Sequence, residues 1–199
     1  MKIHMICGPG GSGKDTLRNE LIRRHNDVLF LDIPYTTRPI RPGEINGVDY
    51  FFRENPPEES ASQSEILDLR KYPTKHGDWY YWHQKIHPEQ SPFVISNILT
   101  VSTMDTIQAY AEAYGANNTY VYYLDVDPCT LLHRMVSREN EKSKPDFAEV
   151  ARRFISDYDI RSEQLSWKIP DGVSYNRIDA NSSIDDVRNT VERIMFYGA

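Results

Sequence analysis

The chain has 199 residues, a formal net charge of −6 at pH 7 and a pI near 5.5. This length suits one α/β domain with inserted subdomains or two small domains. The acidic balance argues against a general nucleic-acid binder, and no apolar run approaches the roughly 20 residues of a membrane span. The short apolar N-terminal run reaches glycines too soon for a signal peptide, and Cys7 and Cys129 lack metal or redox spacing, so we expect a cytoplasmic protein.

The N-terminal segment predicts a phosphate-binding loop between a strand and a helix. An apolar run over Ile3–Cys7 indicates a buried strand, and Leu17, Leu21 and Ile22 have the spacing of one helix face. Glycines between them let backbone N–H groups turn toward anionic oxygens, while a lysine and the helix N-terminus add positive charge. The residues expected to bind ATP are Gly8, Gly10, Gly11, Ser12, Gly13, Lys14, Asp15 and Thr16.

This loop departs from its usual pattern at one position. The pattern G-x-x-x-x-G-K-[ST] places a hydroxyl after the lysine to bind Mg²⁺, and this chain has Asp15 there. Thr16 comes one place later, about 100° further round a helix, so it does not simply substitute. The Asp15 carboxylate either binds Mg²⁺, directly or through water, or weakens ATP binding by its charge; we favour the metal role.

After a second strand over Val28–Leu31 the composition changes. Residues 34 to about 90 are rich in Pro, Tyr, Trp, Arg and Glu, which predicts an inserted, partly β subdomain with a loop at Pro56–Ser64. Arg38 and Arg41 lie among prolines that stiffen the backbone, and two guanidinium groups there suit a phosphate, unless this is simply a solvated hairpin. Asn46-Gly47 is a strong hairpin signal.

The remaining chain alternates strands and helices. Strands are expected over Phe93–Asn97, Tyr120–Leu124 and Val173–Ile178, and helices over Thr103–Tyr114, from Pro128 after an Asp127 N-cap, over about Asp146–Leu165 and over Ile184–Phe196. Arg134 and Arg138 share one side of the second of these helices. This alternation predicts an α/β fold with a doubly wound parallel sheet, covered on both faces.

The motif T-T-R-x-x-R-x-G-E-x-x-G-x-D-Y-x-F, at residues 36–52 and some twenty residues after the glycine loop, resembles guanylate kinases. The resemblance is dense from Met5 to Phe52 and covers the rest of the chain in layout. It implies a P-loop NTPase fold: a single domain over residues 1–199 with a core (1–33, 93–137 and 154–199), an inserted mixed-β subdomain that binds a nucleoside monophosphate (about 34–92) and a helical lid (about 138–153).

The resemblance also implies an activity: transfer of the γ-phosphoryl group of ATP to GMP or dGMP, with Mg²⁺, by a monomer or homodimer. The catalytic residues that it implies are Lys14, Arg38, Arg134, Arg138 and Arg153, and the neighbouring Arg152 leaves the register of the last one open. The acceptor-binding residues that it implies are Arg38, Arg41, Tyr50, Asp68, Tyr80 and Trp82.

Several positions depart from the family pattern around the expected base pocket. Pro34 replaces a serine, and Tyr81-Trp82 replaces a glycine and a hydroxyl residue. Asp68 is the nearest match to the acid that accepts hydrogen bonds from guanine, and Ile95–Ile98 lacks the two acids of an L-D-x-D strand end. Phosphoryl transfer to a monophosphate is therefore a firmer expectation than guanine. The alternatives are a P-loop kinase for a different nucleotide or other small acceptor, and a non-catalytic guanylate-kinase-like binding module.

Overall fold

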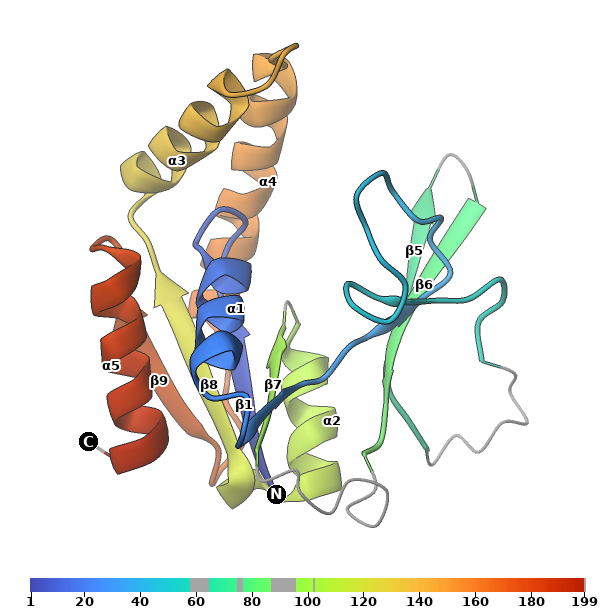
Figure 1. The fold of residues 1–199 in the computed structure, drawn as a ribbon, viewed down its shortest axis with the longest axis vertical. Helices are drawn as coiled ribbons and strands as arrows, with labels where there is room; N and C mark the ends of the chain where they lie inside the picture. The colour runs from blue at the N-terminus through green and yellow to red at the C-terminus, as the bar shows by residue number, and fades with distance from the viewer. Residues whose placement is uncertain (58–64, 75–76, 87–95, 102, 199) are drawn as a thin grey trace.

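The structure is a computed structural model that describes residues 1–57, 65–74, 77–86, 96–101 and 103–198. Within these residues a five-stranded sheet has the order β2-β7-β1-β8-β9, and a four-stranded sheet has the order β4-β3-β6-β5 (Figure 1). All pairings in the larger sheet are parallel, as the alternation of strands and helices predicts. The expected α/β fold with an inserted mixed sheet is confirmed.

The elements lie close to the ranges expected from sequence. The larger sheet contains β1 (Lys2–Cys7), β2 (Leu29–Leu31), β7 (Ser96–Thr100), β8 (Thr119–Asp125) and β9 (Ser174–Asp179). The smaller sheet contains β3 (Tyr35–Thr36), β4 (Phe51–Phe52), β5 (Ile66–Thr74) and β6 (Gly77–Gln84). The helices are α1 (Lys14–Arg24), α2 (Met104–Tyr114), α3 (Pro128–Asn140), α4 (Phe147–Leu165) and α5 (Ile184–Tyr197), with a 3₁₀ turn at Ala116–Asn118. None of the helices in the described ranges has the length and apolarity needed to cross a membrane.

Two of the sequence expectations fall partly or mostly outside the described residues. The first three residues of the strand expected over Phe93–Asn97 lie outside the described residues, and so does most of the loop expected over Pro56–Ser64. The described part of that strand, from Ser96 onward, pairs with β1 and β2.

Side-chain caps account for where three helices begin. The Asp127 carboxylate accepts a hydrogen bond from the Thr130 N–H at 2.9 Å, with Pro128 as the first helical residue of α3. Asp146 caps α4 and Ser183 caps α5 in the same way. Each cap satisfies a backbone N–H that has no partner within the helix, typically for about 1 kcal/mol. The expected N-cap at Asp127 is therefore confirmed.

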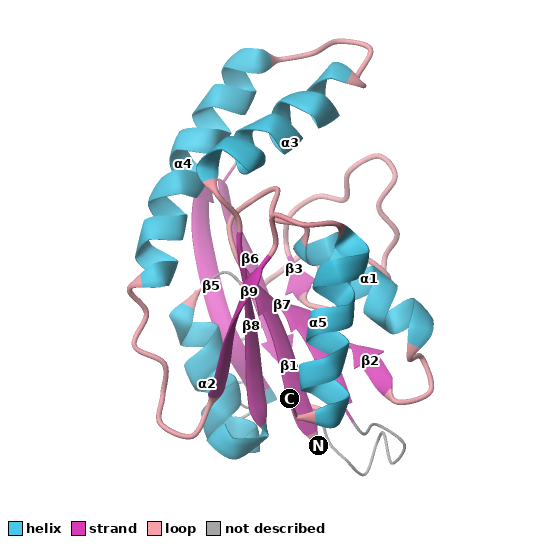
Figure 2. Ribbon diagram, turned by 90° about the vertical axis from the view of Figure 1, so that its left-hand side faces the viewer, coloured by secondary structure: helices cyan, strands magenta, loops and turns pink. Residues whose placement is uncertain are grey.

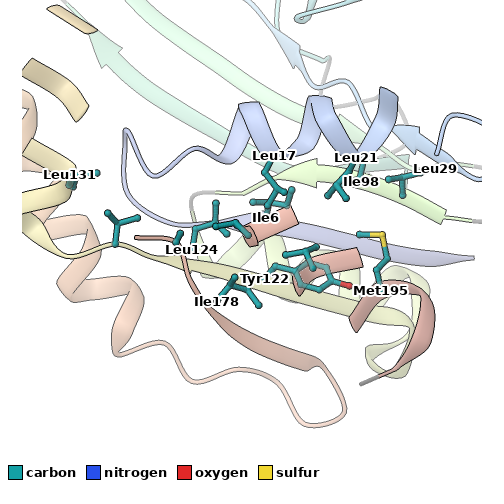
Figure 3. Close-up of a cluster of buried hydrophobic side chains, with 14 of the residues drawn as sticks. Ile6, Leu17, Leu21, Leu29, Ile98, Tyr122, Leu124, Leu131, Ile178 and Met195 are labelled. Carbon is teal, nitrogen blue, oxygen red and sulfur yellow. The ribbon is translucent and has the colours of Figure 1, made fainter. Parts of the chain in front are cut away.

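Two apolar clusters cover opposite faces of the larger sheet. Alternate residues of β1 divide between them, because successive side chains of a strand point to opposite faces. Ile6 packs in one cluster with Leu21 of α1 (Figure 3), whereas Met5 packs in the other with Ile107 of α2. Figure 2 shows α1 and α5 together on one side of the sheet. Strand β1 is thus buried at the centre, and its carboxyl end carries the glycine loop at the edge where doubly wound sheets bind ligands.

The segment between β3 and β4 is a loop rather than the expected hairpin. Tyr35 of β3 pairs in parallel with Phe51 of β4, and parallel strands are not joined by a tight hairpin turn. The Asn46 side chain accepts a hydrogen bond from the Phe52 N–H at 2.9 Å, and the Gly47 N–H donates to the Tyr50 carbonyl at 2.8 Å. The Asn46-Gly47 pair therefore forms a turn here, but this turn does not join two antiparallel strands. Instead, the Asn46 side chain closes a local loop.

A buried histidine in β1 gives the fold a testable pH dependence. Burial lowers the pKa of His4 from 6.5 to about 4, and the charge of Lys2 adds to the shift. Its Nδ1 lies 3.0 Å from the Tyr122 hydroxyl. As pH falls below 6.5 the unfolded chain takes up a proton that the native state refuses until about pH 4. We expect this residue to remove up to about 3 kcal/mol of unfolding free energy over that window.

Urea denaturation at about pH 7 and about pH 4.5 measures this effect. The matched variant is His4→Gln, which keeps a polar group beside Tyr122 and does not titrate. The loss of stability on acidification should be smaller in the variant than in the wild type. An equal loss in both proteins would show that His4 is not responsible.

Candidate active site

The glycine loop has a curved backbone that only glycine adopts readily. Gly8, Gly11 and Gly13 have φ values of +142°, +79° and +97°. Lys14 folds back across the loop, and its Nζ donates to the Gly8 carbonyl at 2.8 Å and to the Pro9 carbonyl at 2.9 Å. These bonds hold the ammonium group inside the curve of the loop, next to the N-terminus of α1. Burial lowers the pKa of Lys14, and the charges of nearby carboxylates oppose that shift.

A cavity of about 410 Å³ opens from the loop, which we call the donor cavity. The expected ATP-binding residues from Gly11 to Thr16 line it, and Gly8 shapes the turn that precedes them. Arg134 and Arg138 of α3 also line it, so the structure brings both predicted arginines to the loop. Arg134 Nη2 donates to the Ala180 carbonyl at 2.8 Å, which ties α3 to the chain just after β9.

Helix α4 approaches the loop at Gly10. A Cβ on this residue would overlap the Asp157 carboxylate of α4, so the absence of a side chain allows the close approach. The Asp157 charge is one of those that act on the pKa of Lys14. In Figure 1 the α3–α4 pair lies above the loop, and the smaller sheet lies to its right. The loop therefore lies between two parts of the molecule that could hold different ligands.

Arg38 is anchored inside the loop that connects β3 to β4. It is 4% exposed, and its two terminal nitrogens bind the Glu44 carboxylate at 3.0 and 2.7 Å. Its guanidinium carbon lies 5.3 Å from the centre of the Tyr50 ring, an arrangement that favours a cation. The Glu44 carboxylate also accepts the Arg41 backbone N–H at 2.7 Å, while the Arg41 side chain is exposed. Glu44 lies in the sequence motif, but sequence reasoning assigned it no role.

A larger cavity of about 720 Å³, which we call the acceptor cavity, lies beside the β5–β6 hairpin. Tyr50 lines it as expected, together with Thr100 at the end of β7. Alternate residues of β6 also line it, namely Trp79, Tyr81 and His83. A third cavity of about 360 Å³, which we call the middle cavity, shares Asp15 with the donor cavity and shares Tyr50 and His83 with the acceptor cavity, so it lies between them.

Comparisons with known proteins agree with this geometry. The family model for guanylate kinase matches residues 1–80. The guanylate kinase of Thermotoga maritima is 25% identical over 197 residues, covering 98% of this chain and 86% of the relative. That of Streptococcus pneumoniae R6 is 29% identical over 173 residues, covering 81% of this chain and 79% of the relative. This chain is therefore similar to guanylate kinases, over residues 1–80 by the family model and over most of its length by these two relatives.

The fold of a solved guanylate kinase also matches this chain. The crystal structure of guanylate kinase from Anaplasma phagocytophilum superimposes with a TM-score of 0.60 and 16% sequence identity. The match covers 99% of this chain and 85% of that chain. At this identity the match concerns the fold alone.

Two of the residues that the family pattern assigns to the acceptor lie on the far face of β6. Tyr80 and Trp82 point away from the acceptor cavity, and Trp82 stacks on Tyr35 with ring centres 5.4 Å apart. Side chains of a strand alternate between faces, so an offset of one residue exchanges the whole set. The structure therefore brings Tyr81 and His83 to the cavity instead. Period-two alternation was the available signal, but it does not say which face is inward.

Asp68 also does not line the acceptor cavity, and Arg38 and Arg41 are likewise absent from its described lining. Asp68 has a positive φ of +50°, and its carboxylate is fully buried behind the wall. Oδ1 lies 2.9 Å from His83 Nδ1, and Oδ2 lies 2.7 Å from the Thr106 hydroxyl and 3.2 Å from Arg70 Nη2. Two residues bound to Asp68, namely His83 and Arg70, line the cavity in its place. Sequence reasoning missed both.

The adjacent arginines of α4 are held by one carboxylate. Glu149 binds Arg152 through two hydrogen bonds of 2.7 and 2.8 Å and binds Arg153 through one of 2.7 Å. These hydrogen bonds lower the pKa of Glu149 well below its usual range. The Arg152 side chain is 67% exposed and lines the acceptor cavity, whereas Arg153, at 53% exposed, is not among the described lining residues. The structure thus places Arg152, and not the expected Arg153, at the wall of the cavity.

The residues around the middle cavity are compatible with a magnesium ion that also binds phosphate. Asp15 and Asp32 both line this cavity. Mg²⁺ commonly takes one or two carboxylates, several waters and the phosphate oxygens of a substrate. Within the described ranges no group of three His, Cys, Asp or Glu side chains is placed to hold a metal, so the phosphates would have to complete the site. Burial raises the pKa of Asp32, whose carboxylate accepts a hydrogen bond from the Tyr110 hydroxyl.

Proposed function

We propose that this protein transfers the γ-phosphoryl group of ATP to a nucleoside monophosphate, producing ADP and the nucleoside diphosphate. GMP and dGMP are the acceptors that the similarity to guanylate kinases favours. The observation that carries the proposal is the row of three cavities. The donor cavity contains the glycine loop, the acceptor cavity contains Tyr50 next to buried Arg38, and the middle cavity adjoins both. Such a row suits a transfer between two bound phosphates.

The reaction needs positioning and charge neutralisation more than covalent help from the protein. The transferring phosphoryl group passes through a loose transition state with charge on its outer oxygens. An acceptor phosphate oxygen forms a bond to the γ-phosphorus as the bond from the γ-phosphorus to the β–γ bridging oxygen breaks, and ADP leaves with that oxygen. No general base is required, because the attacking oxygen is already anionic at neutral pH.

Residues of the loop would hold the donor and residues of the smaller sheet would hold the acceptor. Backbone N–H groups from Gly11 to Lys14 would bind the β-phosphate of ATP, and Lys14 would exchange its carbonyl partners for β- and γ-oxygens. Arg38, Arg41 and Tyr50 would hold the acceptor phosphate. In this arrangement Glu44 keeps the Arg38 fork oriented between turnovers.

The expected division into core, acceptor-binding subdomain and lid forms part of this proposal. We propose that residues of about 138–153, at the tips of α3 and α4, act as the lid. Arg134 and Arg138 would contact ATP, and Arg152 or Arg153 would approach the transferring group when the lid closes. Closure would exclude water and limit hydrolysis of ATP.

Asp15 is the residue that we propose for magnesium, with ATP oxygens and waters completing the shell. When bound, the ion would neutralise charge on the β- and γ-phosphates. The Asp15 side chain is 72% exposed, and it forms an ion pair of 3.4 Å with Arg18. Its carboxylate is therefore accessible from the cavities that it lines.

The test is ADP release by the purified protein with Mg-ATP against a panel of ribo- and deoxyribonucleoside monophosphates. Turnover that depends on one or more of them supports the proposal. If no nucleoside monophosphate supports ADP release while ATP still raises the thermal unfolding midpoint, the result would favour another small acceptor or a non-catalytic binding module. The absence of any ATP effect would contradict nucleotide binding itself.

The two faces of β6 provide a paired prediction about the acceptor phosphate. We expect Tyr81→Phe to lower kcat/KM for the acceptor about 10- to 100-fold, because it removes a hydroxyl that can donate to a charged group. Tyr80→Phe should change it less than about 3-fold, since Tyr80 faces away from the cavity. Steady-state kinetics at saturating ATP measures both variants. A larger loss in Tyr80→Phe would restore the assignment made from the family motif.

A further inference from the structure

The acceptor cavity contains cationic and hydrogen-donating groups but no carboxylate among its described lining residues. Arg70 of β5, His83 of β6 and Arg152 of α4 contribute to its walls. Tyr72, Trp79 and Tyr81 add aromatic rings. Aromatic rings suit a flat base, whereas guanidinium and imidazole groups select for the atoms at its edge.

Asp68, the acid that the family pattern assigns to the base, is already fully engaged. An ionised carboxylate is an acceptor only, and donors approach both Asp68 oxygens. The His83 backbone N–H and ring Nδ1 lie 3.2 and 2.9 Å from Oδ1, and the Thr106 hydroxyl lies 2.7 Å from Oδ2. Arg70 Nη2 lies 3.2 Å from the same Oδ2. The carboxylate is 0% exposed, so it cannot reach a ligand in the cavity without breaking these bonds.

Because of these contacts, the wall of the acceptor cavity presents hydrogen-bond donors to a ligand and not a carboxylate acceptor. With Nδ1 facing Asp68, the other ring nitrogen of His83 is the one left to meet a ligand. Arg70 is held by Asp68 through one terminal nitrogen, and its Nε has no hydrogen-bond partner among the described residues. Burial alone would lower the pKa of His83, but the hydrogen bond to Asp68 and the charge of Asp32 outweigh it and raise the pKa. A protonated ring would donate from both nitrogens.

We propose that Arg70 and His83 determine acceptor specificity by donating hydrogen bonds to the end of the acceptor that lies away from the transferred phosphate. The inference rests on the proposed phosphoryl transfer and names its substrate class. That end carries hydrogen-bond acceptors, as in the carbonyl edge of a pyrimidine base or in a second anionic group. The N1–H and amino donors of guanine would find no free carboxylate in this wall.

The first experiment compares kcat/KM for CMP, UMP, GMP and fructose 1,6-bisphosphate at saturating Mg-ATP. We expect CMP or UMP to exceed GMP by at least about 10-fold, because unpaired donors in a closed pocket weaken transition-state binding. A preference for the bisphosphate would also support the inference and would identify an anionic group as the source. A preference for GMP overturns the inference and leaves the proposed function intact. If none of the four supports turnover, the inference falls, and the full panel of nucleoside monophosphates then decides the proposed function separately.

The second experiment uses neighbouring residues on opposite faces of one strand. Arg70→Ala should raise KM for the preferred acceptor at least about 10-fold, leave KM for ATP unchanged and reduce the preference over GMP. Lys71→Ala is the matched control, since Lys71 is exposed and forms an ion pair with Asp78 on the far face. Arg70→Gln keeps a shorter, uncharged hydrogen-bond donor and guards against a folding defect, which thermal unfolding monitors. Folded Arg70 variants with unchanged acceptor KM and unchanged preference would overturn the inference.

Discussion

The Lys14→Met variant is expected to lose about 10³-fold in kcat/KM for ATP. Lys14 is the cation that the glycine loop encloses, and its Nζ already lies within 2.9 Å of two loop carbonyls. Charge that develops on the transferring phosphate would lose its nearest fixed counter-charge. Methionine has similar length and tolerates buried surroundings, so the loop should keep its general shape.

The matched control for this variant is Lys2→Met, which removes the lysine at the first residue of β1, at the end of that strand away from the glycine loop. Lys2 is exposed, and its ammonium lies 5.4 Å from the centre of the Tyr120 ring. We expect it to change kcat/KM for ATP by less than about 3-fold. Steady-state kinetics and ATP titration measure both variants. A loss below about 10-fold for Lys14→Met would mean that backbone N–H groups alone carry phosphate binding and transfer.

The second large effect is expected on stability. Gly8→Ala should lower the free energy of unfolding by about 3 kcal/mol and weaken ATP binding as well. Gly8 has a φ of +142°, and a Cβ there would lie 2.8 Å from the Leu124 backbone carbonyl. A backbone atom in β8 cannot move aside as a flexible side chain can, so the loop or the strand must shift.

Gly43→Ala separates backbone strain from this close contact. Gly43 also has a positive φ, of +89°, but nothing lies within 4 Å of the Cβ that alanine would add. We expect this control to lose only about 1 kcal/mol, the usual cost of a left-handed conformation for a residue with a Cβ. Urea denaturation measures both. Equal losses in the two variants would show that the contact with Leu124 is not decisive.

Local signals in the chain predicted the elements that lie next to each other in sequence. The strand, glycine loop and helix from Lys2 to Arg24 form one continuous unit, and their pattern depends on residues a few positions apart. The Asp127 cap acts on a residue only three positions later, at Thr130. Interactions of such short range can be recognised without knowing the rest of the fold.

The face of β6 that meets the acceptor could not be predicted in this way. Tyr80 and Tyr81 are adjacent and chemically alike, and an alternating strand presents one or the other depending on its register. That register is set by pairing with β5, where Lys71 faces Tyr80 and Arg70 faces Tyr81, with an irregularity between Leu67 and Arg70. A family motif that is aligned by sequence alone does not take that irregularity into account.

The sequence by itself determined the glycine loop and the doubly wound α/β fold and showed the resemblance to guanylate kinases, because these depend on local spacing and on side chains that recur in fixed order. Only the tertiary structure decided what surrounds the acceptor. Asp68 contacts His83 of β6 and Thr106 of α2, which lie 15 and 38 residues further along the chain. These partners occupy its carboxylate oxygens, so that neither is free to accept a hydrogen bond from a ligand. Burial and saturation of a polar group are properties of its neighbours in space, so no local pattern contains them.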